Sequence, residues 1–282
     1  MLKGSIRLFR IGGIELAVHG TFFILLAYVA WMGWREAIAV HEPGYAGALV
    51  NSMYVIVFFA CVVLHEFGHA FAARYFGIAV PRILLLPIGG MAQMASIPRK
   101  PSREFIVAIA GPAVNLAIIV VLLLFDHFPG EQIRWYMRYF FDLRTTGGVV
   151  VELSLTQLLI MMNTLMGCFN LIPVFPMDGG RILRALLATR LPYVTATFVA
   201  ATIAKVFATS GVILSLFWFR EPRYLTALLF GFIFFVGEIE YRSLKRREEE
   251  DARWRRVLAE LRAASPEPPV TPPSVSDRVT GQ

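Results

Sequence analysis

The segment VLHEFGH, residues 63–69, combines two histidines and a glutamate at a spacing that suits metal-dependent hydrolysis. On a helix, His65 and His69 lie one above the other and can bind a single Zn²⁺. Glu66 points to the same site and can act as a general base, as in the His-Glu-x-x-His signature of metalloproteases. Two packed core histidines would give the same pattern in a soluble helix, so the residues around the motif have to decide.

The residues before the motif favour a metal site. No charged residue occurs from Ala46 to Leu64, so the motif lies at the end of an apolar helix of membrane length. An ionisable side chain in hydrocarbon costs about 3 kcal/mol or more, and such groups are generally functional. Cys61 lies one turn before His65, and we interpret it as a small core residue rather than as a redox group. The motif therefore predicts a zinc site inside a bilayer.

The composition agrees with a membrane protein. The chain of 282 residues is 57% hydrophobic and 17% charged, with a mean hydropathy of +0.62. Soluble domains average about 45–50% apolar and about 25% charged residues. The basic residues behind the net charge of +7 flank apolar segments, so they indicate membrane topology rather than nucleic-acid binding. Both cysteines fall in apolar segments, so no oxidised extracellular framework is expected.

The pattern of apolar segments predicts an all-α integral membrane protein with six transmembrane helices and a short re-entrant β-like loop near the active site. The chain divides into an N-terminal cytoplasmic surface segment (1–15), a six-helix intramembrane domain (16–241), a charged cytoplasmic helix (242–264) and a disordered Pro- and Ser-rich tail (265–282). The six spans are expected at 16–34, from about 46 through the motif, and at 105–125, 153–175, 191–219 and 224–241.

The segment 80–94, VPRILLLPIGGMAQM, is too short and too interrupted to cross a bilayer as a helix. Non-helical backbone at membrane depth is tolerated only where protein or a water-filled cavity covers it. We therefore interpret it as a re-entrant loop beside the zinc site, with an ordinary surface loop as the alternative. Its extended backbone is predicted to bind the substrate strand through Ile83, Leu84, Leu85, Leu86, Pro87, Ile88, Gly89 and Gly90.

Two further motifs supply polar groups from other spans. Asn115 follows a Gly-Pro kink by one turn in AGPAVN and is a candidate to hold substrate or to stabilise an oxyanion. Asp178 lies on a corner shaped by prolines and glycines in NLIPVFPMDGGR. A catalytic zinc typically keeps three protein ligands and one water, and Asp178 completes a set with the two histidines. Zinc would lower the pKa of its water, and Glu66 would take the proton as hydroxide attacks a carbonyl.

The distribution of Lys and Arg predicts a cell-membrane protein with several spans and both termini in the cytoplasm, because cytoplasmic segments are generally the more basic ones. In this topology the second and fourth spans both run inward, and each carries its motif at its inner end. His65, His69 and Asp178 can then meet near the cytoplasmic side.

Together the motifs HEFGHAFAARYFG, PIGGMA, AGPAVN and NLIPVFPMDGG resemble the site-2 protease family of intramembrane zinc metalloproteases. The resemblance covers residues from about 14 to 181 and looks most like the six-span branch of bacteria and archaea. It implies one Zn²⁺ per chain with His65, His69 and Asp178 as ligands, Glu66 as the catalytic acid/base and Asn115 in the catalytic centre. It also implies a single-pass membrane protein as substrate.

Two departures from the family pattern limit what carries over. No outer loop is long enough for a PDZ domain, and the soluble tail is too small for nucleotide-sensing CBS repeats, so no nucleotide is expected. A regulatory membrane partner or an oligomer stays open. A non-proteolytic membrane zinc protein or a metal transporter is the main alternative, although Glu66 would be surplus to coordination there. A protease for prenylated C-termini would use a glutamate ligand on a later helix instead of Asp178.

Two other polar residues in apolar segments have two interpretations each. Lys205, in the middle of the fifth span, could pair with a carboxylate or line a water-filled path, and a snorkelling or bundle-paired structural lysine is the alternative. His19, at the start of the first span, could act in gating, although a hydrogen-bonded interfacial histidine is the safer interpretation.

Overall fold

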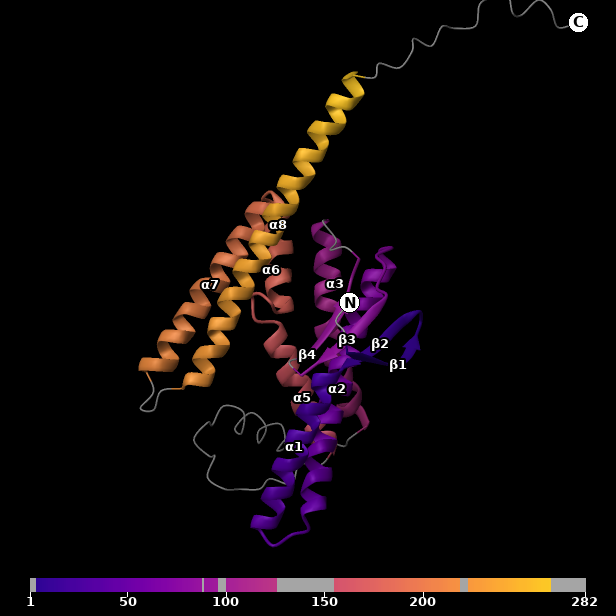
Figure 1. The fold of residues 1–282 in the computed structure, drawn as a ribbon, viewed down its shortest axis with the longest axis vertical. Helices are drawn as coiled ribbons and strands as arrows, with labels where there is room; N and C mark the ends of the chain where they lie inside the picture. The colour runs from indigo at the N-terminus through magenta and orange to yellow at the C-terminus, as the bar shows by residue number, and fades with distance from the viewer. Residues whose placement is uncertain (1–3, 88, 96–99, 126–154, 219–222, 265–282) are drawn as a thin grey trace, which may run out of the picture.

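The computed structural model describes residues 4–87, 89–95, 100–125, 155–218 and 223–264 (Figure 1). The described chain is mostly helical and carries one small sheet. Its helices are α1 (Gly20–Ala39), α2 (Gly44–Tyr75), α3 (Pro101–Phe125), α5 (Leu155–Asn170), α6 (Asp178–Leu187), α7 (Tyr193–Phe217) and α8 (Tyr224–Ala264). The prediction of a helical membrane protein with a small extended element is confirmed.

Five helices of the described chain are long and apolar enough to cross a membrane: α1, α2, α3, α7 and α8. The expected fourth span corresponds to α5, of which 16 residues are described. That length is below the roughly 20 residues a spanning helix needs. The number of spans therefore stays a prediction.

Helices α7 and α8 lie side by side, and the C-terminal half of α8 extends well beyond the other elements (Figure 1). The expected sixth span and the expected charged helix are one continuous helix of 41 residues. The sequence explains this continuity, because residues 238–264 contain neither Pro nor Gly, the two residues that most readily end a helix. The residues change from apolar to charged at about 242, which changes the surroundings that suit the helix, while its backbone continues without a break.

Four strands form a sheet in the order β1-β2-β3-β4, namely β1 (Ser5–Ile11), β2 (Ile14–His19), β3 (Arg82–Leu86) and β4 (Gly89–Gln93). Pairing is antiparallel for β1 with β2, parallel for β2 with β3, and antiparallel for β3 with β4. The sequence predicted extended backbone only near 83–86, and the N-terminal hairpin is an addition. Because residues 14–19 pair in β2, the first long helix begins at Gly20 instead of Leu16, and His19 caps it by accepting a hydrogen bond from the Thr21 backbone N–H at 3.3 Å.

The central strand β3 is a core element. Ile83, Leu84 and Leu85 are at most 4% exposed, and they lie between β2 and β4. An ordinary surface loop would not bury three consecutive large side chains. The loop is thus part of a sheet that packs against α2 at the depth of the motif, while β4 forms one edge of that sheet.

Candidate metal centre

Helix α2 places His65 and His69 one turn apart, with each residue 3% exposed and the ring centroids 4.7 Å apart. The neighbouring helix α3 leaves room for them through Gly111. A Cβ at this position would lie 2.6 Å from Cε1 of His69 and 2.7 Å from Cε1 of His65, closer than real Cβ contacts allow. Gly68 has the same function on α2, where a Cβ would lie 2.6 Å from the Ala110 carbonyl oxygen. Glycines on both helices thus allow α3 to close over the histidines.

Asp178 reaches the histidines from the N-terminus of α6, where it is 7% exposed. The two glycines that follow it bring the chain against the preceding turn. A Cβ on Gly180 would lie 2.6 Å from the Val174 carbonyl carbon, and one on Gly179 would overlap the carbonyl oxygens of residues 171 and 172. The predicted corner is therefore a close backbone contact that only glycine permits, and it fixes the position of the carboxylate.

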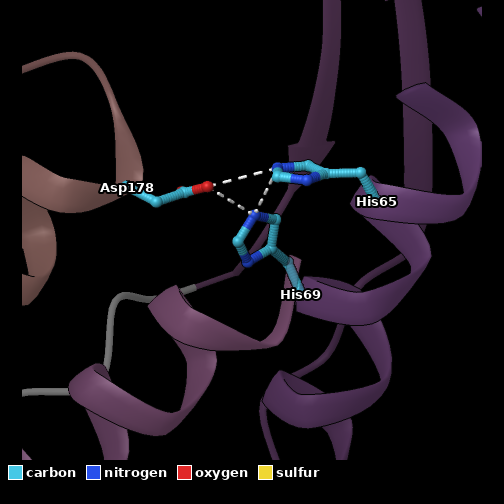
Figure 2. Close-up of side chains that lie close together, drawn as sticks. All are labelled: His65, His69 and Asp178. Atoms are coloured by element: carbon cyan, nitrogen blue, oxygen red, sulfur yellow. Dashed lines mark hydrogen bonds and ion pairs between the residues drawn. The ribbon is translucent and has the colours of Figure 1, made fainter. Parts of the chain in front are cut away.

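The three predicted ligands converge on one point (Figure 2). Oδ2 of Asp178 lies 3.2 Å from Nε2 of His65 and 3.1 Å from Nε2 of His69, and the two Nε2 atoms are 3.1 Å apart. A tetrahedral Zn²⁺ with bonds of about 2.0–2.2 Å would hold its ligand atoms about 3.4 Å apart. The ligand spacing therefore fits one zinc ion.

The hydrogen bonds behind these atoms support the same conclusion. Nδ1 of His69 donates to the Val107 carbonyl oxygen at 2.7 Å, which leaves its Nε2 lone pair directed at the cluster. Burial raises the pKa of the Asp178 carboxyl, but the two histidines outweigh this effect and hold the pKa well below its usual range. A buried carboxylate beside two imidazole nitrogens is a donor set that a divalent cation would satisfy.

Glu66 lies beside the cluster and belongs to a different contact. Its Oε2 accepts a hydrogen bond from the Ala92 backbone N–H of β4 at 3.0 Å. Gly90 makes this approach possible, since a Cβ there would lie 2.6 Å from Cγ of Glu66. The metal-ligand group within the described residues consists of the two histidines and Asp178 without Glu66. Its carboxylate is thus held between the cluster and the edge of the sheet.

Asn115 lies on α3 one turn beyond Gly111, on the face that covers the histidines. It is 1% exposed, and neither atom of its amide has a hydrogen-bond partner among the described residues. A buried amide without partners is costly unless it serves a ligand or a bound water. The structure thus puts Asn115 one turn from the glycine that the histidines contact, and its amide makes no hydrogen bond with the three ligands.

Comparison with known proteins identifies the family. The sequence profile described as peptidase family M50 matches residues 53–217, which contain all three predicted ligands, Glu66 and Asn115. The chain belongs to peptidase family M50. The resemblance to site-2 proteases noted from the motifs is thereby confirmed.

Several relatives of this M50 member are described. A zinc metalloprotease of Methanocaldococcus jannaschii is 36% identical over 241 residues, which are 86% of this chain and 62% of that protein. Stage IV sporulation protein FB of Bacillus subtilis is 30% identical over 149 residues, 52% of this chain and 45% of that protein. The chain therefore spans less than two thirds of the length of these relatives. A solved site-2 protease from Methanocaldococcus jannaschii matches with a TM-score of 0.52 at 36% identity, covering 84% of this chain and 95% of that one.

The predicted substrate-binding residues divide into two groups in this M50 member. Residues 83–85 of β3 are paired on both sides, so they have no free backbone edge to offer a peptide, and Leu86 pairs with Gly89 of β4. Pro87 lies in the turn, and Ile88 is outside the described residues. Gly89 and Gly90 lie on β4, the edge strand, and they are the predicted loop residues that a substrate strand could meet.

Sequence reasoning missed a buried charge cluster around Arg184 on α6. Arg184 is 1% exposed and binds Glu104 of α3, with Nε to Oε1 at 2.7 Å, and Glu240 of α8, with Nη1 to Oε1 at 2.8 Å. Its guanidinium also lies 5.1 Å from the ring of Phe175. Burial lowers the pKa of Arg184, but the neighbouring carboxylates raise it above its usual value, so the side chain stays charged. The helix that begins with Asp178 is thereby fastened to α3 and α8.

Lys205 and Cys61, for which the sequence left more than one role open, both contact a polar side chain. Lys205 pairs with Glu238 of α8 at 3.0 Å, which favours the bundle-paired interpretation. Cys61 is buried and accepts a hydrogen bond from the Asn163 amide at 3.3 Å, as expected for a core residue.

Proposed function

We propose that this chain is an intramembrane zinc endopeptidase that cuts a membrane-anchored protein in or near its transmembrane segment. The observation that carries this proposal is the buried group of His65, His69 and Asp178, with Glu66 held beside it by an edge strand. Family membership and the membrane-length helices support the same activity.

Each residue has a separate role in the proposed reaction. The two histidines and Asp178 would hold the zinc ion, which supplies Lewis-acid activation of water and of the peptide carbonyl when it is bound. Glu66 would accept the proton of the attacking water and deliver it to the leaving nitrogen. The Asn115 amide would donate a hydrogen bond to the carbonyl oxygen as negative charge develops there.

The free edge of β4 would hold the substrate. Alternate residues of an antiparallel strand direct their N–H and C=O groups to opposite sides. Because the Ala92 N–H reaches Glu66 and not β3, residues 90 and 92 direct their backbone groups away from the sheet, toward the candidate base. A substrate strand that pairs with this edge would lie beside Glu66 and the ligand group.

The substrate, the side of the membrane and the partners belong to the same proposal. The substrate would be a single-pass membrane protein that is cut near its cytoplasmic end. The enzyme would lie in the cell membrane with both termini in the cytoplasm, and its active site would lie near the cytoplasmic side. A regulatory membrane partner or an oligomer is compatible with it. The exposed apolar faces of α1, α7 and α8 suit contact with lipid.

Exchange of single residues tests this function. Purified Glu66→Gln should keep its zinc and lose cleavage, because Glu66 is a base and not a ligand. Asp178→Ala and His65→Ala should lose zinc and cleavage together. Membrane fragments compared between cells with wild type and cells with Glu66→Gln would reveal the substrate. Full zinc content in Asp178→Ala would contradict the ligand set, and normal cleavage by Glu66→Gln would contradict the mechanism.

A further inference from the structure

A cavity of about 360 Å³ lies between β4, the start of α3 and α6. Residues 91–93 of β4 and Met94, just after the strand, line it on one side. Consecutive side chains of a strand point to opposite faces, so a cavity that touches three strand residues in succession runs along the strand edge. Val107 lines the opposite wall, and its carbonyl oxygen is the one that binds His69. The cavity therefore runs along the edge of the sheet next to the ligand group.

Among the residues that the structure describes, one cation, Arg181, lines this cavity. Arg181 lies on α6 three residues after Asp178, close to one helical turn. Its partly buried guanidinium makes no hydrogen bond or ion pair with any residue that the structure describes. The carboxylate of Glu104 borders the same cavity, but Arg184 binds it at 2.6 and 2.7 Å. The charge of Arg181 acts on Asp178 and Glu104 through space, but neither carboxylate contacts its guanidinium. The N–H donors of Arg181 are therefore available to a group that enters the cavity.

We propose that Arg181 binds an acidic side chain of the substrate close to the peptide bond that is cut. This inference rests on the proposed function, because it places the substrate strand along β4. A partly buried guanidinium without a hydrogen-bonded partner is costly, and a carboxylate in direct contact compensates its charge whereas a neutral carbonyl oxygen does not. The planar guanidinium also fits a carboxylate through two parallel hydrogen bonds. The cavity is within the range of about 300–1,000 Å³ that holds small ligands, so a side chain fits.

The specificity that follows is unusual for a membrane substrate. Cytoplasmic ends of transmembrane segments are generally rich in Lys and Arg. An enzyme with Arg181 in its substrate cavity would disfavour those cations and select substrates with Asp or Glu near the cut. Charge-assisted hydrogen bonds predict a preference of about tenfold to a hundredfold over the neutral isostere.

The test uses the full-length protein in lipid nanodiscs, loaded with zinc, and a transmembrane peptide with a Gly-containing cytoplasmic end. Asp is placed at each position around that end in turn, with Asn at the same position as the matched control. Binding is measured in the inactive Glu66→Gln background, and kcat/KM is measured in the active protein. We expect Asp to be preferred at one position, the preference to disappear in Arg181→Met, and Lys to be preferred in Arg181→Glu.

Controls separate this proposal from the others. Arg190→Met removes an exposed cation from the chain just after α6, outside the cavity, and should leave the preference unchanged. Zinc content equal to that of wild type in Arg181→Met shows that the ligand group is intact. If Arg181→Met does not fold, Arg181→Lys keeps the charge without the planar fork and should weaken the preference.

Three results have distinct meanings. Equal binding of the Asp and Asn peptides at every position overturns the Arg181 proposal, and so does a preference that persists in Arg181→Met. If the Asp preference is present in binding while the wild-type protein cuts none of the peptides, the proposed function fails and the assignment of Arg181 stands.

Discussion

Replacing Gly111 by Ala tests whether α3 closes over the histidines as described. The added Cβ would lie 2.6 Å from Cε1 of His69 and 2.7 Å from Cε1 of His65, whereas ordinary contacts begin at 3.4 Å. The new Cβ is attached to the backbone of α3 and cannot turn away, so the imidazole rings would have to move by roughly 1 Å. Metal–ligand distances are held to within about 0.2 Å, so this shift would disrupt binding. We expect zinc affinity to fall by about 100-fold or more. Mutations of residues that support a metal ligand typically lower metal affinity by about 10-fold to 100-fold, so this loss would be at or above the upper end of that range.

Zinc affinity would be measured by competition with a chelator on the purified protein, together with helix content by circular dichroism. Gly231→Ala is the matched control, because a Cβ at that position of α8 meets nothing within 4 Å. It should keep both zinc and helix content. Wild-type zinc affinity in Gly111→Ala would refute the contact between α3 and the ligand group, and with it the placement of Asn115 beside that group.

Four other predictions address the base, the charge cluster, the topology and the substrate. Gly90→Ala should retain zinc and reduce kcat, because the new Cβ would lie 2.6 Å from Cγ of Glu66; an unchanged kcat would contradict the packing of β4 on the base. Arg184→Met should lower the free energy of unfolding by about 3–5 kcal/mol, since it leaves a buried carboxylate unpaired, and adding Glu104→Gln should recover part of this loss in denaturant titrations. Reporter fusions after Asp142 should face outward and fusions after Arg247 inward, and opposite results would move the site to the outer side. Substrates in which Gly, Pro, Asn or Ser of the scissile helix are replaced by Leu or Ala should be cut more slowly, because an intact helix hides its amides; equal rates would show that unwinding is not needed.

The metal ligands could be predicted from the sequence because zinc chemistry restricts residue type and spacing. His65 and His69 share one helix, so their geometry follows from the period of the helix. Asp178 is 109 residues beyond His69, and three features pointed to it: its Pro- and Gly-shaped corner, the expected depth of its span and the family resemblance. The structure places its carboxylate at 3.1–3.2 Å from both imidazoles, as a shared metal requires.

The sheet was only partly predictable. Residues 83–86 are apolar and flanked by Pro and Gly, which favours extended backbone. Residues 14–19 are mostly apolar but run directly into a long hydrophobic segment, so a short strand and the first turns of a helix give the same pattern. The parallel pairing of β2 with β3 decides between them, and pairing between residues 67 positions apart leaves no local trace in the sequence.

The charge cluster shows why some supporting residues escape sequence analysis altogether. Arg184 meets Glu104 across 80 residues and Glu240 across 56, on three helices whose arrangement depends on packing. In the sequence, each of these residues is a charged residue near the end of an apolar segment, and this position by itself predicts a solvated side chain. Arg184 and Glu104 are both buried, and this has a consequence for the site. Separating them leaves an uncompensated buried charge, so α3 and α6 keep one arrangement, and this arrangement helps to fix the position of Asp178 relative to the histidines.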